Sequence, residues 1–154
     1  MAAEELEIAP AEEAELEWCA RLMASSDPWI TLGRAYGACL ERVRRAGSEV
    51  LVARRGGHPQ GFVLLEPRGV AGSPYIASIA VAPEVRSGGV GSALVARAEG
   101  RYPEARHMFL CVSSFNGRAR ALYERLGYRA VGELPDYIVD GASEILMHKR
   151  LVRP

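Results

Sequence analysis

The sequence predicts a single α/β domain, residues 1–154, whose sheet contains both antiparallel and parallel strand pairs. Residues 49–54 and 60–66 are β-rich runs joined by a Gly-Gly turn, which is typical of an antiparallel hairpin. Two further apolar runs, at 75–81 and 108–113, are separated by a helical pattern, which predicts a strand–helix–strand crossover and a parallel pair. The length of 154 residues, with 49% hydrophobic and 25% charged residues, suits one globular domain.

Periodicity and turn residues place the other elements. Pro10 and the acidic residues after it suit the first turn of a helix. Thr31 is the expected N-cap of a second helix, which has a clear apolar stripe. Residues 67–73 and 132–136 are rich in turn formers and are expected to be connections. In chain order we expect strand 5–8, helices 10–23 and 31–43, strands 49–54, 60–66 and 75–81, helix 90–100, strand 108–113, helix 116–126, and strands 128–131 and 143–149.

Charge and cysteine usage exclude several classes of function. The formal net charge is +0, so no overall basic field favours nucleic acid or an anionic membrane. The three cysteines and three histidines lack metal-ligand spacing, and an odd cysteine count argues against a disulfide framework, so we expect no metal site. No apolar stretch is long enough to span a membrane, and the acidic N-terminus lacks the apolar core of a signal peptide. We therefore expect a cytoplasmic protein that binds neither nucleic acid nor membrane.

A glycine-rich stretch, VRSGGVGSAL at 85–94, connects the strand expected at 75–81 to the following helix. Gly88, Gly89 and Gly91 have no Cβ, so their backbone N–H groups can approach a ligand closely. The start of a helix also leaves N–H donors unpaired and carries partial positive charge. These features together predict an anion site best suited to phosphate.

Two familiar phosphate loops are excluded. A Walker A loop needs lysine at its end, and the only lysine of the chain is Lys149. The dinucleotide fingerprint needs a third glycine, where this chain has Leu94. A plain glycine-rich turn between strand and helix is the alternative at this point.

Two motifs resemble the GNAT superfamily of N-acetyltransferases. Arg86-x-x-Gly89-x-Gly91 resembles the loop that binds the pyrophosphate of acyl-CoA in that family. Downstream, the stretch 109–128 resembles the family pattern N-x-x-A-x-x-L/F-Y-x-x-x-G-F/Y. Its matching residues are Asn116, Ala119, Leu122, Tyr123, Gly127 and Tyr128. The resemblance covers residues 75–149 well, whereas the first half matches in element order only.

The resemblance implies a fold, a cofactor and a set of cofactor contacts. The implied fold is a GNAT-like mixed, mostly antiparallel sheet with a splayed parallel strand pair at its centre and about four helices. A β-bulge would open the gap between these strands and take the pantetheine arm of acetyl-CoA. By resemblance, the cofactor-binding residues are Ile79, Ala80, Val81, Arg86, Ser87, Gly88, Gly89, Val90, Gly91, Ser92, Asn116 and Tyr123.

The implied reaction is direct transfer of an acetyl group from acetyl-CoA to a primary amine. Backbone N–H groups of residues 79–81 could stabilise the oxyanion that forms on the thioester carbonyl. Tyr123 occupies the family's general-acid position and would protonate the departing thiolate. Packing or cofactor contact alone is the other interpretation of Tyr123.

The glutamate that serves as general base in some members of the family has no counterpart in this chain. Relatives that acetylate the N-terminal alanine of a ribosomal protein have a glutamate where this chain has Cys111. A buried neutral thiol accepts a proton poorly. Glu66, Asp136 and Glu144 are the candidate bases, with a water relay as another route. Cys111 itself is either a core residue or an acyl-carrying nucleophile.

The amine acceptor is left open between a peptide or protein N-terminus and a small molecule. Residues 134–150, near the end of the chain, loosely resemble protein N-terminal acetyltransferases, of which the ribosomal-protein type is the most similar. The resemblance places an acceptor pocket between the first two helices and the last hairpin. Its expected residues are Trp29, Thr31, Leu32, Tyr36, Asp136 and Tyr137.

Two other classes of function compete with the enzyme. Cys111 in place of the acid also suits a non-catalytic acyl-CoA-binding or sensor domain. A structural subunit that pairs through an exposed sheet edge is the third reading. A homodimer is compatible with each of them, and the preferred acyl-CoA is not specified by the residues.

Overall fold

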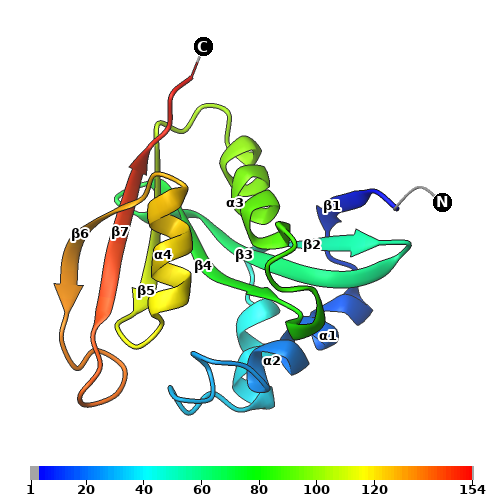
Figure 1. Ribbon diagram of the computed structural model, residues 1–154, viewed down its shortest axis with the longest axis horizontal. Coiled ribbons are helices and arrows are strands. Elements are labelled where there is room, and N and C mark those ends of the chain that lie inside the picture. The colour runs from blue at the N-terminus through cyan, green and yellow to red at the C-terminus, as the bar shows by residue number, and fades with distance from the viewer. Residues whose placement is uncertain (1–3, 154) are drawn as a thin grey trace.

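The computed structural model describes residues 4–153, and its seven strands form one sheet. The strand order is β1-β2-β3-β4-β5-β7-β6, and every neighbouring pair is antiparallel except β4–β5. Figure 1 shows α3 and α4 on the near face of the sheet, whereas α1 and α2 lie on the other side. The elements are β1 (Leu6–Pro10), α1 (Glu13–Ala24), α2 (Tyr36–Val43), β2 (Glu49–Arg55), β3 (His58–Val70), β4 (Ser73–Val81), the 3-10 helix η1 (Pro83–Val85), α3 (Val90–Arg101), β5 (His107–Ser113), α4 (Gly117–Arg125), β6 (Arg129–Leu134) and β7 (Glu144–Arg150). The expected mixed sheet and four helices are confirmed.

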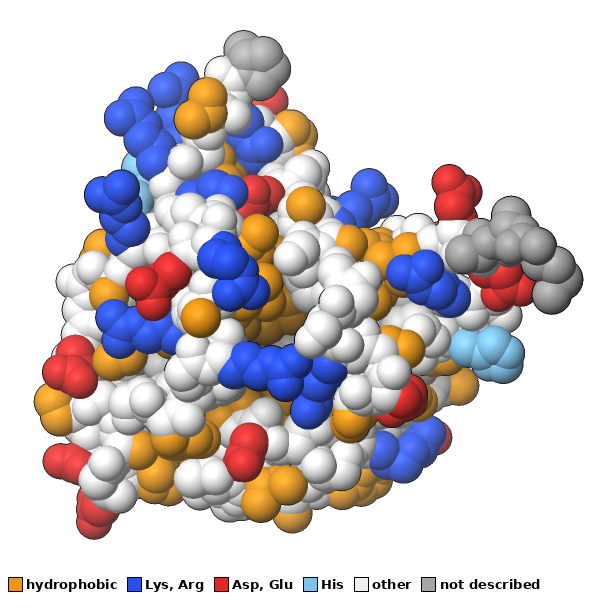
Figure 2. Space-filling model, in the orientation of Figure 1, with side chains coloured by type: hydrophobic (Ala, Val, Ile, Leu, Met, Phe, Trp, Pro, Cys, Tyr) orange, Lys and Arg blue, Asp and Glu red, His pale blue; other side chains and the backbone are white. Residues whose placement is uncertain are grey.

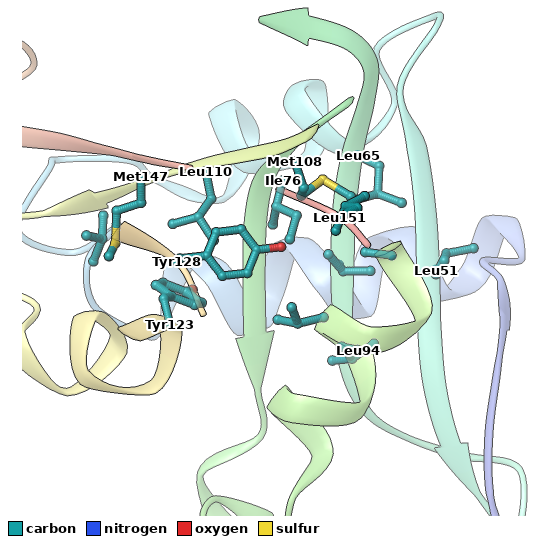
Figure 3. Close-up of a cluster of buried hydrophobic side chains, with 14 of the residues drawn as sticks. Leu51, Leu65, Ile76, Leu94, Met108, Leu110, Tyr123, Tyr128, Met147 and Leu151 are labelled. Atoms are coloured by element: carbon teal, nitrogen blue, oxygen red, sulfur yellow. The ribbon is translucent and has the colours of Figure 1, made fainter. Parts of the chain in front are cut away.

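The two faces of the sheet have separate hydrophobic cores. Alternate residues of β2 point to opposite faces, so Leu51 belongs to the core covered by α3 and α4 whereas Val52 belongs to the core covered by α1 and α2. On the α3–α4 side, Leu94 of α3 and Tyr128 are buried (Figure 3), and Tyr128 donates a hydrogen bond to Glu99 at 2.8 Å. On the other side, Arg54 of β2 bonds Glu15 of α1 (Nε to Oε2, 2.5 Å). Each helix pair is therefore fixed to its own face.

The central strands part after two residues of pairing. β4 and β5 pair only at Tyr75–Phe109 and Ile76–Leu110. In the β3–β4 ladder, Leu64 pairs with Ser78 and Leu65 with Ile76, so Ala77 is an extra residue and forms a β-bulge. A bulge bends its strand and breaks the ladder locally, and beyond it β4 diverges from β5 (Figure 1). The splayed parallel pair is thus confirmed, with Ala77 at its origin.

Four predicted boundaries are wrong. Pro10 is the last residue of β1 and not part of the first turn of α1, which begins at Glu13, because Pro10 pairs with Leu51 of β2. The second helix begins at Tyr36 and not at Thr31, because Asp27 Oδ1 accepts hydrogen bonds from both the backbone N–H and the hydroxyl of Thr31 (3.0 and 2.6 Å). That capping forms a separate turn at 27–33, which ends at Gly33 with φ +72°.

The residues expected to be connections are largely strand. β3 continues through Pro67 to Val70, because Ala71 and Gly72 both have positive φ (49° and 82°) and form a tight hairpin turn to β4. β6 likewise continues through residues 132–134, which pair with β7. No helix within residues 4–153 combines the length and the apolar character needed to cross a bilayer.

A side chain at Gly61 should destabilise the fold. A Cβ there would lie 2.7 Å from the backbone oxygen of Ala80 and 3.2 Å from Leu94 Cδ1, so β3 and β4 must move apart. We expect Gly61→Ala to lower the free energy of unfolding by about 1–3 kcal/mol, measured by urea denaturation. Gly132→Ala is the matched control, since nothing lies within 4 Å of its added Cβ. Equal effects of the two substitutions would contradict the close approach at Gly61.

Candidate functional site

The junction of β4, η1 and α3 presents unpaired N–H groups to solvent. Gly89 is the N-cap of α3 and has φ +84°, a conformation that favours glycine. Its carbonyl accepts the first helical bond, from Ala93 N (3.0 Å). The N–H groups of the first turn, residues 90–92, precede that bond and have no helical partner. Ser87 has φ +69°, and such strained residues cluster at functional sites.

A cavity of about 680 Å³ lies against this junction, and we call it the loop cavity. It is bordered by three arginines: Arg86, Arg118 and Arg125. Arg118 at the start of α4 donates to Ser87 Oγ (2.9 Å), and Arg86 Nε donates to the backbone oxygen of Val81 (3.1 Å). Figure 2 shows a hollow between α3 and α4 that has hydrophobic side chains inside and basic side chains on its border. The loop cavity thus combines an apolar floor with positive charge.

Eleven of the twelve predicted cofactor residues line the loop cavity. The exception is Gly88, whose N–H is bonded to the backbone oxygen of Val85 (3.3 Å) and so shapes the loop from within. Gly91 allows α3 to approach α4, because an added Cβ would lie 3.3 Å from Leu122 Cδ2. The eleven are Ile79, Ala80, Val81, Arg86, Ser87, Gly89, Val90, Gly91, Ser92, Asn116 and Tyr123.

The loop cavity also contains a buried hydroxyl that lacks a partner. Ser26, just after α1, is 5% exposed, and its Oγ makes no hydrogen bond within the described residues. A buried polar group of this kind costs free energy unless a ligand or water satisfies it. An apolar cleft with a basic end and an unsatisfied hydroxyl fits an elongated ligand that carries phosphate at one end and amide groups along its length.

A second cavity, of about 510 Å³, lies where β4 and β5 diverge, and we call it the sheet cavity. Its floor comes from β4 and β5, and its other walls come from the α1–α2 region and the start of β7. The two cavities share five residues: Pro28, Trp29, Ile79, Asn116 and Tyr123. A ligand in one cavity can therefore meet a ligand in the other beside the splayed strands.

Tyr123 lies at this meeting point. Its side chain is 5% exposed and its ring packs edge-on to Tyr128, with 6.4 Å between centroids (Figure 3). Burial raises the pKa of the Tyr123 phenol well above its ordinary value, so the hydroxyl keeps its proton at neutral pH. Asn116 positions the helix that carries Tyr123, because its Oδ1 caps α4 by accepting from Ala119 N (3.3 Å).

Cys111 lines the sheet cavity but is poorly suited to act as a base or a nucleophile. Burial raises the pKa of its thiol, and the interaction with the Tyr75 hydroxyl only partly offsets that shift. Burial and this same interaction raise the pKa of Tyr75. Both groups are therefore neutral at physiological pH.

The three candidate bases lie in very different surroundings. Glu66 is bonded to Arg42 and Ser48 (2.6 Å each), and although burial raises its pKa, these bonds prevail and hold the pKa below its ordinary value. Asp136 is exposed and accepts from Gly141 N (2.6 Å). Neither lines either cavity.

Glu144 is the one of the three that lines the sheet cavity. It is 8% exposed, and its Oε2 accepts a hydrogen bond from Ser113 Oγ (2.7 Å) on the facing strand. The β5–β7 ladder pairs Ser113 with Glu144, and Cys111 lies two residues before Ser113 on the same face. The Glu144 carboxylate therefore lies on the cavity side of the sheet, near the position that Cys111 occupies.

Only two of the six residues expected in the acceptor pocket line the sheet cavity. Trp29 and Leu32 line the sheet cavity, whereas Thr31, Tyr36, Asp136 and Tyr137 do not. Sequence reasoning missed several polar residues that contribute to the two cavities. These are Ser26, Arg34, Arg42, Arg45, Tyr75, Ser113 and Arg118. Arg118 had a local signal, two residues after the motif residue Asn116, and Arg42 and Arg45 lie in a short basic stretch that suits a solvated helix end equally well.

Replacement of Cys111 should be tolerated. We expect Cys111→Ser to keep at least half of the wild-type turnover and to bind ligand normally, because the neutral thiol performs no chemical step. Steady-state kinetics measure this, and mass spectrometry of wild-type protein incubated with acetyl-CoA should detect no acetyl-cysteine at this position. An acetylated Cys111 that forms and decays at the rate of turnover would contradict this expectation.

Comparison with known proteins agrees with this geometry. Residues 11–128 match the model of the acetyltransferase (GNAT) family. The chain is 39% identical over 82 residues to an uncharacterized N-acetyltransferase of Methanocaldococcus jannaschii, covering 51% of this chain and 53% of that protein. It is 39% identical over 66 residues to a blasticidin-S acetyltransferase of Streptomyces morookaense, covering 40% and 46%. The chain thus matches about half the length of these curated relatives.

Structural similarity extends over nearly the whole chain. An aminoglycoside 6′-N-acetyltransferase solved in complex with coenzyme A superposes with a TM-score of 0.77, covering 96% of this chain and 99% of that one at 17% identity. This likeness establishes the shared fold. Since the family model spans both the glycine-rich loop and the α4 motif, the chain belongs to the acetyltransferase (GNAT) family.

Proposed function

We propose that this protein is an acetyl-CoA-dependent N-acetyltransferase that transfers the acetyl group directly to a primary amine. The observation that supports this most strongly is the meeting of two cavities at Ile79, Asn116 and Tyr123. One cavity has the charge and backbone donors for a pyrophosphate, and the other has room for an acceptor. Two substrates can then be present together, which direct transfer requires.

The loop cavity would hold the cofactor along its length. The N–H groups of residues 90–92 and the guanidinium groups of Arg86 and Arg118 suit the pyrophosphate. Beyond the bulge at Ala77, no strand within residues 4–153 pairs with the edge of β4 that faces β5, and this edge can bond the pantetheine amides. Acetyl-CoA supplies the acetyl group as an activated thioester.

Two side chains would handle the protons of the reaction. Glu144 would take a proton from the amine, directly or through water, because it is the candidate carboxylate that lines the sheet cavity. Tyr123 would donate a proton toward the departing sulfur, because its raised pKa keeps the phenol protonated. Backbone N–H groups of residues 79–81 would stabilise charge on the thioester oxygen.

A non-catalytic acyl-CoA-binding or sensor domain is the second candidate, and Cys111 in place of a carboxylate is the observation that favours it. It predicts cofactor binding without transfer to any amine. A structural subunit would use a sheet edge, and β6 is an exposed edge strand, but that role predicts no tight cofactor binding. The cytoplasmic location and the homodimer remain predictions.

Cofactor binding tests the first step of the proposal. By titration calorimetry we expect wild-type protein to bind acetyl-CoA and Gly89→Glu to lose binding, because that change adds negative charge and a strained φ at the helix N-cap. Arg118→Gln should weaken binding about tenfold. Arg120→Gln is the control, since Arg120 pairs with Glu124 and lies outside the loop cavity. Normal binding by Gly89→Glu would sink the cofactor assignment.

Turnover variants test the proton-transfer roles. We expect Tyr123→Phe and Glu144→Gln each to lower kcat about 100-fold while acetyl-CoA affinity stays within about twofold of wild type. Thiol release with a reactive amine measures kcat, and calorimetry measures affinity.

A second-site variant distinguishes a lost base from a damaged site. Because Cys111 and Glu144 lie on the same face of neighbouring strands, Cys111→Glu should restore part of the turnover in the Glu144→Gln background. Full activity of Glu144→Gln alone would remove Glu144 from the mechanism. Thermal unfolding of each variant serves as the folding control.

A further inference from the structure

The charged groups of the sheet cavity are divided between two walls. On the β5–β7 wall, Glu144 is the carboxylate, and the neighbouring Tyr75, Cys111 and Tyr123 are kept neutral by their raised pKa values. The other wall is formed by residues 34–45, which include α2, and contributes Arg34, Glu41, Arg42 and Arg45. The lining of the sheet cavity therefore combines a carboxylate from the start of β7 with a predominantly basic group from the α2 region.

Two of the three arginines are available to a ligand. Arg42 is committed to Glu66 (2.6 Å) and Ser48 (3.0 Å). The side chains of Arg34 and Arg45 are exposed and form no ion pair within residues 4–153. A guanidinium group is suited to bidentate bonds with a carboxylate or phosphate.

The rest of the sheet cavity is lined mostly by apolar side chains. Hydrophobic side chains from α1, the α1–α2 segment, β4, β5 and the β6–β7 connection face it, and they include Met23, Trp29, Leu32, Ile76, Leu110 and Ile138. An acceptor that uses both walls then has an amine at Glu144, an anionic group bound by the long arginine side chains, and an apolar part against the remaining lining. A polycationic acceptor would instead need several carboxylates, and among the described lining residues only Glu41 and Glu144 provide one.

We infer that the acceptor is a small primary amine that also carries an anionic group, as a free apolar amino acid does. This inference rests on the proposed acetyl transfer and specifies its substrate class. The amine lies at Glu144 and Ser113, and the anion lies at Arg34 and Arg45. The α-amine of a peptide and a polycationic antibiotic both lack the anionic group beside the amine.

Product binding tests the inference without relying on turnover. Calorimetry on protein saturated with coenzyme A compares N-acetylleucine with N-acetylleucinamide, which differ in the carboxylate and contain no titrating amine. We expect N-acetylleucine to bind about tenfold more tightly, and the difference to shrink as salt is raised. Equal or tighter binding of the amide would overturn the inference.

Arginine variants locate the anionic end. In the doubly substituted protein Arg34→Gln, Arg45→Gln, the affinity ratio of acid to amide should fall about tenfold. Arg44→Gln is the matched control, because Arg44 also lies at the end of α2 but pairs with Glu13 (2.8 Å) and Glu17 (3.6 Å) outside the cavity. An unchanged ratio in the double variant would overturn the assignment of these arginines.

An acceptor panel separates this inference from the proposed function. Thiol release is measured with leucine, leucinamide, a short peptide and kanamycin. Faster acetylation of leucine than of kanamycin and the peptide supports the inference. Acetylation of the peptide or kanamycin without acetylation of leucine overturns the inference and leaves acetyl transfer standing. No release with any amine, in protein that binds acetyl-CoA, counts against the proposed function itself.

Discussion

The bulge at Ala77 is the constraint on which the site depends. One extra residue in β4 interrupts its ladder with β3, and β4 then pairs with β5 at only two positions. A continuous parallel pair would leave no gap at the centre of the sheet and no free backbone edge. The bulge therefore creates the unpaired edge of β4 and the opening in which the two cavities meet.

The two helical layers use that opening from opposite sides. α3 and α4 supply the glycine-rich N-terminus, Arg118 and Tyr123, whereas the α1–α2 region supplies Ser26 and Trp29. Tyr123 of α4 lines both cavities although its side chain is only 5% exposed.

Much of the fold and the loop could be predicted from sequence because the signals are local. The Gly89–Gly91 spacing, the cap at Asn116 and the apolar run of β4 each arise from a few consecutive residues, and the structure brings all three to the loop cavity. Gly88 belongs to the same motif but serves the loop's own hydrogen bonding, which spacing cannot reveal. The start of α2 was predicted at Thr31, whereas α2 begins at Tyr36. The hydrogen bonds that Thr31 donates to Asp27 make residues 27–33 a separate turn.

The acceptor side could not be predicted in the same way, because tertiary pairing determines it. The sequence does not rank the three candidate bases Glu66, Asp136 and Glu144. They are distinguished only by the β5–β7 register and by the hydrogen bond between Arg42 and Glu66. Tyr75 and Arg34 enter the sheet cavity from elements far apart along the chain. Serine is common in loops, and the burial of Ser26 without a hydrogen-bond partner among residues 4–153 is visible only in three dimensions.

Amide hydrogen exchange with and without acetyl-CoA tests the central claim most directly. If the bulge frees β4 to bind the cofactor, slowed exchange should concentrate at residues 78–81 and 87–93, while β1 and β2 change little. Binding that leaves the amides of β4 unprotected, or that protects the β6 edge instead, would contradict the account, because the opening at Ala77 would then play no part in cofactor recognition.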